Sequence, residues 1–261
     1  MSQRTLIAVV MLGWLFCGPA GAQTVEEENR EAVRGAAPNK TDLPDLIRAA
    51  ELIVNKTNDF RVKEGQKAVK ANEKLVATAQ YFAGFMAKTD EYGHTADGNS
   101  PAQRATKHGY DYCIILENIA YAYDSRGFTA EQLVDEFFNG WKHSPEHRKN
   151  MLDPDVFDTA VAVARSEKTG YYYAVQMFGR LKSQAIRFEI ENNAGEAVSY
   201  TIGKRTFNLP PRMIRTHTQC RPSEVKFRWP GDEKTDATVK PAKDDKFVVI
   251  KSAGQFAVKK E

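Results

Sequence analysis

The chain has 261 residues, of which 27% are charged and 42% hydrophobic, close to the average for soluble globular proteins. Lys and Arg (37) nearly balance Asp and Glu (34), which leaves a formal net charge of +3. Nucleic-acid-binding proteins usually concentrate positive charge on one face. This balance provides no such excess, so we expect no nucleic-acid partner.

The first residues have the pattern of an export signal. Arg4 supplies a positive start, residues 6–16 form an apolar run, and residues 20–22 (Ala-Gly-Ala) match a small-residue cleavage site. The run is shorter than the roughly 20 apolar residues that span a bilayer, which favours a cleaved signal over a membrane anchor. Bulky Phe16 before Cys17 argues against a lipoprotein anchor.

A flexible leader and a series of helices are expected after the signal. Residues 23–41 are polar and include a Gly-Ala-Ala-Pro stretch, which predicts the leader. Apolar side chains recur at helical spacing in residues 43–61 and 72–86, which predicts two helices with one buried face each. Three further helix starts are indicated by cap residues, of which the first two have Gln three positions later: Ser100, Thr129 and Ser144.

The pattern then changes to that of strands. Residues 160–164 and 171–178 are apolar, β-prone runs separated by a hairpin loop, so the first domain is expected to be α+β and to end near residue 180. After Gly179, short alternating runs and regular turn signals predict a small antiparallel β domain, a sandwich or a barrel, over residues 185–261. The charged stretch 232–246 is expected to be a solvated loop.

Two cysteines remain after the signal, Cys113 and Cys220. An exported protein enters an oxidising compartment, so a disulfide between them is chemically allowed. Two unrelated buried thiols are an equally good interpretation. No C-x-x-C pattern is present, which excludes a redox dithiol motif and a zinc knuckle.

Six stretches, in order, resemble the CAP superfamily, which contains cysteine-rich secretory proteins, antigen 5 and plant pathogenesis-related proteins. The resemblance covers about residues 42–180 and is closest to the bacterial branch. It implies a three-layer α-β-α fold with a polar central cleft. The stretches that carry it are 54–61 (VNKTNDFR), 72–86 (from N-x-x-L-x-x-x-A), 94–110 (H-x-x-x-G, P-x-x-R and G-Y), 117–120 (ENIA), 141–152 (WKHSPEHRKNML) and 173–179 (YAVQMFG).

The resemblance also implies a set of cleft residues. His94 and Glu117 match two of the family's cleft positions, and His147 matches the second histidine through the bacterial W-x-x-S-P-x-H variant. Ser144 stands where many relatives have a second Glu. Two imidazoles and a carboxylate can hold a divalent metal such as zinc with one position open. The same three groups can instead form a buried hydrogen-bond network, which we favour over a metal site and over a general acid–base pair.

Signatures of common enzyme classes are missing: there is no G-x-S-x-G elbow, no Walker loop, no G-x-G-x-x-G and no H-E-x-x-H. We therefore expect a secreted or periplasmic, non-enzymatic binding module for a small apolar or amphipathic ligand, or for an envelope or extracellular protein. The alternatives are a metal-assisted hydrolase that uses the cleft residues and a structural envelope protein. No transmembrane span is expected after signal cleavage.

The signal pattern makes one direct prediction. Processing after Ala22 should leave a mature chain that begins at Gln23, outside the cytoplasm. N-terminal sequencing of the protein from its native host checks this, and a sequence that begins at Met1 would contradict it.

Overall fold

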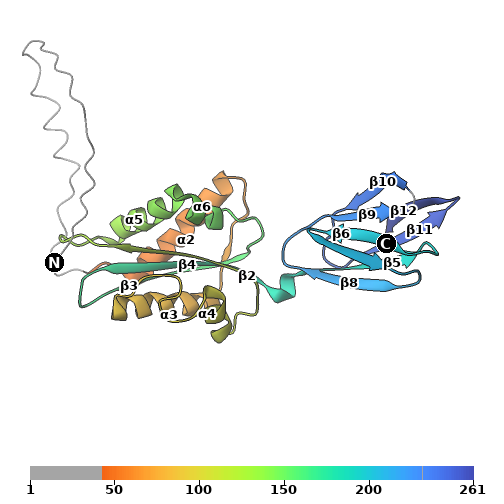
Figure 1. Cartoon of the computed structure of the whole chain (residues 1–261). Coiled ribbons are helices and arrows are strands. Elements are labelled where there is room, and N and C mark those ends of the chain that lie inside the picture. The colour runs from red at the N-terminus through yellow and green to blue at the C-terminus, as the bar shows by residue number, and fades with distance from the viewer. Residues whose placement is uncertain (1–42, 231) are drawn as a thin grey trace, which may run out of the picture.

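The computed structural model describes residues 43–230 and 232–261, with the side chains of 232–236 left out (Figure 1). The signal and the leader predicted from the sequence lie outside the described residues. A helix-and-sheet part comes first, and two further sheets follow it in the chain.

The sheet of the first part has four strands in the order β1-β3-β4-β2. β1 is Lys70–Ala71, β2 is Tyr112–Ala122, β3 is Asp158–Arg165 and β4 is Tyr172–Leu181. The pairs β2–β4 and β3–β4 are antiparallel, and the short pair β1–β3 is parallel. β2 is therefore a long edge strand.

Helices cover both faces of this sheet (Figure 1). α2 (Leu46–Lys63), α5 (Ala130–His143) and α6 (Pro145–Met151) lie on one face, and α3 (Glu73–Thr89) and α4 (Pro101–Lys107) lie on the other. Each face has its own apolar core, around Trp141 on the first and Phe82 on the second. The predicted three-layer α-β-α fold is confirmed.

The predicted helix starts at Ser100 and Thr129 both have complete capping boxes. Each hydroxyl accepts from the N–H three residues later, and Gln103 and Gln132 bond back to the cap N–H at 2.8 Å. β2, in contrast, is not among the predicted strands. Its side chains pack into the apolar cores on both faces of the sheet. The strand therefore lacks the alternation of polar and apolar residues that is typical of a strand with one solvent-exposed face.

The C-terminal part is a sandwich of two four-stranded sheets rather than a barrel, and the expected antiparallel pairing is wrong for β5 and β11, which pair in parallel. One sheet has the order β10-β9-β6-β7 and the other β12-β11-β5-β8, and a single apolar cluster lies between them. The strands are β5 (Ile186–Asn193), β6 (Val198–Ile202), β7 (Arg205–Leu209), β8 (Ile214–Gln219), β9 (Val225–Trp229), β10 (Asp232–Val239), β11 (Asp245–Ser252) and β12 (Gln255–Lys260). The loop expected over 232–246 is wrong in its first half, which forms β10 and pairs with β9.

The two parts are joined by more than the short helix η1 (Lys182–Gln184). A disulfide connects Cys113, near the start of β2, with Cys220, just after β8. Arg180 donates to the Cys220 carbonyl at 2.8 Å, and Arg221 forms ion pairs with Asp153 and Asp155 at 2.8 and 3.0 Å. The joint is thus one covalent bridge surrounded by arginine contacts.

Gly179 on β4 occupies a position that has no room for a side chain. A Cβ there would lie 2.5 Å from the hydroxyl oxygen of Tyr110, a fully buried ring whose O–H donates to Asp158 at 2.7 Å. We expect Gly179→Ala to lower the free energy of unfolding by about 1–3 kcal/mol, the usual cost of overpacking. The measurement is denaturant unfolding.

The matched control is Gly84→Ala, at an exposed position in α3 where an added Cβ meets nothing within 4 Å. Removing a glycine from a helix interior should stabilise the protein by up to about 1 kcal/mol. Equal effects of the two substitutions would contradict the steric explanation.

Candidate functional site

Arg104 lies at the centre of the candidate site. The Ser100 capping box and Pro101 begin the short helix α4, which carries this side chain towards β2. The guanidinium is 0% exposed. Its Nη1 donates to Asp97 and to the Asn99 carbonyl, both at 2.7 Å. Its Nη2 donates to the His94 carbonyl at 3.0 Å and to both oxygens of Glu117 at 2.9 and 2.7 Å.

Glu117, in the middle of β2, receives contacts from two sides. Besides the contacts with Arg104, its Oε1 lies 2.8 Å from Nδ1 of His94. Its side chain is 1% exposed, whereas that of His94 is 50% exposed. The carboxylate is therefore compensated inside the protein, and the imidazole of His94 connects it to the surface.

Asp97 is the second acid of the cluster and is 1% exposed. Burial alone would raise its pKa, but hydrogen bonds from Asn99 and the positive charge of Arg104 outweigh burial and hold the pKa below its ordinary value. Arg104 thus faces two buried carboxylates.

A second polar network places His147 on the other side of β2. Asn118 donates to the His147 carbonyl at 3.2 Å and to Gln176 at 2.9 Å, and it accepts from Asn150 at 2.9 Å. Gln176 in turn donates to Thr57 on α2 at 2.9 Å. This chain of amides fixes α6 against the edge strand.

The pKa of His147 lies below its ordinary value. Burial is the main cause, the positive charge of a protonated His94 adds to it, and Glu146 opposes both. His147 therefore remains neutral at lower pH than a free histidine. Within the described residues no hydrogen bond joins His94 to His147, so their convergence in one site stays a prediction.

Ser144 contributes only its backbone to this region. It ends α5 and precedes α6, its carbonyl accepts from the Arg148 N–H at 2.8 Å, and its side chain makes no cap hydrogen bond. The side chain is half-buried.

Residues 54–178 match the family described as the cysteine-rich secretory protein family, CAP. This segment belongs to the CAP family. The resemblance found in the sequence is confirmed. An uncharacterised curated relative, YkwD of Bacillus subtilis strain 168, is 27% identical to this chain over 142 residues. That match covers 54% of this chain and 51% of the relative, so the chain spans about half the length of the curated relative.

Solved structures of bacterial surface and extracellular proteins are also similar to the CAP domain. An outer surface protein of Borrelia burgdorferi has a TM-score of 0.47 and 18% identity, and the match covers 53% of this chain and 96% of that protein. An extracellular protein containing an SCP domain from Bacillus anthracis has a TM-score of 0.42 and 20% identity, over 51% of this chain and 40% of its own.

The geometry does not fit a three-ligand metal site. In residues 43–230 and 232–261, no three His, Cys, Asp or Glu side chains are grouped to hold a metal ion. Around Glu117, both carboxylate oxygens accept from Arg104 and Oε1 also contacts His94, so this carboxylate is already engaged inside the protein. The sequence prediction did not include Arg104 among the site residues. Its place in the P-x-x-R motif is the signal that indicates a role in the site.

Removing the Arg104 charge should unfold much of this cluster. Arg104→Leu leaves Glu117 and Asp97 buried without their counter-charge, and we expect a loss of about 3–5 kcal/mol in the free energy of unfolding. Arg104→Lys keeps the charge but not the forked geometry, and its stability should lie between that of Arg104→Leu and that of the unchanged protein.

The control for this prediction is Arg148→Leu, since Arg148 pairs with Glu64 where both side chains are more than a third exposed. An exposed pair contributes at most about 1 kcal/mol. Thermal and denaturant unfolding of the three variants tests the order, and a cost for Arg104→Leu no larger than for Arg148→Leu would contradict it.

Proposed function

We propose that the protein is an exported, non-enzymatic binding module. In this view the CAP cleft, with His94 and His147 at its rim, binds a small apolar or amphipathic ligand or a partner protein. The observation that carries the proposal is the pairing of Glu117 with Arg104 inside the protein. A general base needs a carboxylate that can reach a substrate proton, and this one is held by a guanidinium on both oxygens.

Export is supported by two observations. The N-terminal sequence has the order of a cleavable signal. The Cys113–Cys220 disulfide is the kind of bond that persists in secreted and periplasmic proteins. In the part of the chain that the structure describes, no helix is long and apolar enough to cross a membrane.

The sandwich would serve as an accessory domain over residues 185–261, after a CAP domain over residues 42–180. Its own apolar core favours independent folding. It would recognise a component of the cell envelope. A structural envelope protein would need a domain with the same role.

The competing function is a metal-assisted hydrolase. His147, with its lowered pKa, is a neutral imidazole at pH 7 and could bind zinc together with His94. If Glu117 turned from Arg104 towards a metal, the buried guanidinium would lose one of its two counter-charges. This cost is the reason that we place the hydrolase second.

Two measurements on the mature protein distinguish the functions. We expect titration with zinc chloride in a calorimeter to show no tight binding, and mass spectrometry to find a co-purified amphipathic molecule or partner. His94→Ala should release that molecule, whereas His143→Ala, an exposed histidine on α5, should retain it. Tight zinc binding that is lost in His94→Ala and His147→Ala but kept in His143→Ala would support the hydrolase instead.

A further inference from the structure

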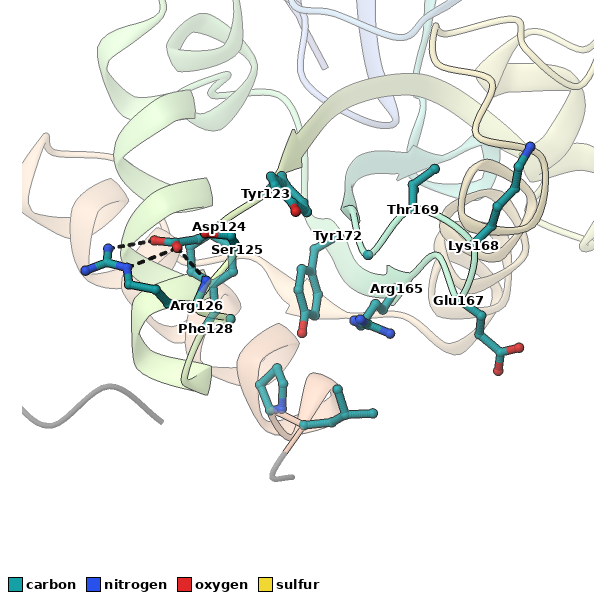
Figure 2. A pocket seen from close by; sticks show the side chains of 14 residues that line it. Tyr123, Asp124, Ser125, Arg126, Phe128, Arg165, Glu167, Lys168, Thr169 and Tyr172 are labelled. Atoms are coloured by element: carbon teal, nitrogen blue, oxygen red, sulfur yellow. Dashed lines mark hydrogen bonds and ion pairs between the residues drawn. The ribbon is translucent and has the colours of Figure 1, made fainter. Parts of the chain in front are cut away.

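A cavity of about 400 Å³ lies beyond the C-terminal end of β2 and is lined by none of His94, Glu117 and His147. The loop after β2 (residues 123–128) forms one wall, and the loop between β3 and β4 (residues 165–172) forms another. Figure 2 shows that the side chains of Arg165 and Tyr172, which belong to the second wall, lie between the two loops. We call this cavity the hairpin pocket. Its size is within the roughly 300–1,000 Å³ range of small-molecule sites.

The hairpin pocket is lined by charges of both signs. Arg126 donates to Asp124 through Nε at 3.1 Å and through Nη2 at 2.8 Å, and these bonds hold the pKa of Asp124 at about 2. The guanidinium of Arg165 lies 5.7 Å from the centre of the Tyr172 ring. Of the 14 lining residues, three are cationic and two are anionic: Arg126, Arg165, Lys168, Asp124 and Glu167. Such a lining offers both donors and acceptors without a strong net charge.

The β3–β4 wall is fixed by a contact with α3. Asp90, which ends that helix, accepts from the Thr169 hydroxyl at 2.7 Å and from the Tyr173 hydroxyl at 3.2 Å. These contacts hold the β3–β4 loop in place in the absence of a ligand. A ligand that binds in the hairpin pocket would therefore not have to order this loop.

Aromatic rings continue from the pocket along the edge strand. Tyr123 stacks on Tyr171 with ring centres 5.0 Å apart, Tyr171 contacts Tyr121 at 5.8 Å, and Tyr121 contacts Tyr92 at 4.9 Å. We call these four the tyrosine row. Tyr92, Tyr121 and Tyr123 are 46%, 55% and 54% exposed. Aromatic rings stabilise a protein mainly by being buried. A contiguous group of exposed rings therefore indicates a surface that is covered when a partner or ligand binds.

We propose that the hairpin pocket and the tyrosine row form a second binding site, which takes a neutral glycan built from equatorially substituted pyranoses. A pyranose ring of this type has apolar C–H faces that pack on aromatic rings and a rim of hydroxyls. Each hydroxyl is both a donor and an acceptor. The paired Asp124 and Arg126 supply both partners, and the tyrosine row supplies the apolar contact for successive sugar units.

Other ligand classes fit less well. An acyl chain needs a continuous apolar lining, but five of the 14 lining residues are charged. Lys, Asp and Glu are depleted at protein–protein interfaces, and three of the five charged lining residues are of these types, which disfavours a protein partner. A polyanion or polycation would meet repulsion from either the anionic or the cationic members of the lining.

The test is calorimetry of the mature protein with β-1,4-linked hexamers of glucose and of N-acetylglucosamine. At least one hexamer should bind. Tyr123→Ala and Arg165→Ala should each weaken the binding by roughly tenfold or more, the effect of losing one central contact. Tyr112→Ala should leave it unchanged, because Tyr112 is also exposed on β2 but at the opposite end of the strand.

Thermal unfolding checks that each variant is folded. If Tyr123→Ala does not fold, Arg126→Ala replaces it, since that side chain is 75% exposed and can be removed without disturbing the core. Failure of both hexamers to bind, or binding that Tyr123→Ala and Arg165→Ala leave intact, overturns the proposal. Binding of phosphatidylcholine vesicles or of a protein in place of the hexamers, lost in Tyr123→Ala, also overturns it.

Discussion

The buried guanidinium of Arg104 is the interaction on which the candidate site depends. Taking a charge of this kind out of water costs several kcal/mol unless the protein compensates it. Here Glu117 and Asp97 provide opposite charge, two carbonyls accept from it, and the Phe82 ring lies 3.4 Å away. One of those carbonyls belongs to His94, so Arg104 holds the loop that carries His94 as well as the Glu117 carboxylate. The position of the His94 imidazole therefore depends on the buried guanidinium of Arg104.

Local signals in the sequence were sufficient for many elements. The caps at Ser100 and Thr129 work through atoms three residues apart, so the sequence contains both partners and the structure reproduces them. Six motifs in a fixed order then identified the CAP fold, which no single periodicity could do. Neither β8 nor β10 was predicted as a strand, because their mostly polar residues show little of the alternation that indicates strands.

The candidate site was predictable only as a set of residues. Motif matches selected His94 and Glu117, and the structure places them in hydrogen-bond contact. What could not be foreseen is how the charges are shared, because Glu117 lies on a strand with two buried faces that periodicity did not detect. Glu117 and Arg104 are 13 positions apart in the sequence, on a strand and a helix. No sequence pattern predicts a contact between two such residues. The pairing of charges in a site depends on tertiary contacts, even where the fold can be predicted from the sequence.

The disulfide at the joint has a consequence for how the molecule carries mechanical load. Cys113 and Cys220 are 107 positions apart, and the chain between them includes β3, β4 and the first four strands of the sandwich. Tension applied at the two ends of the described chain would pass directly from residue 113 to residue 220 and bypass everything between them. The enclosed strands cannot be extended while the bond is intact. A chain held at one end and bound at the other would therefore yield first in its helices α2 to α4 or in its last strands, with β2, β3 and β4 still folded.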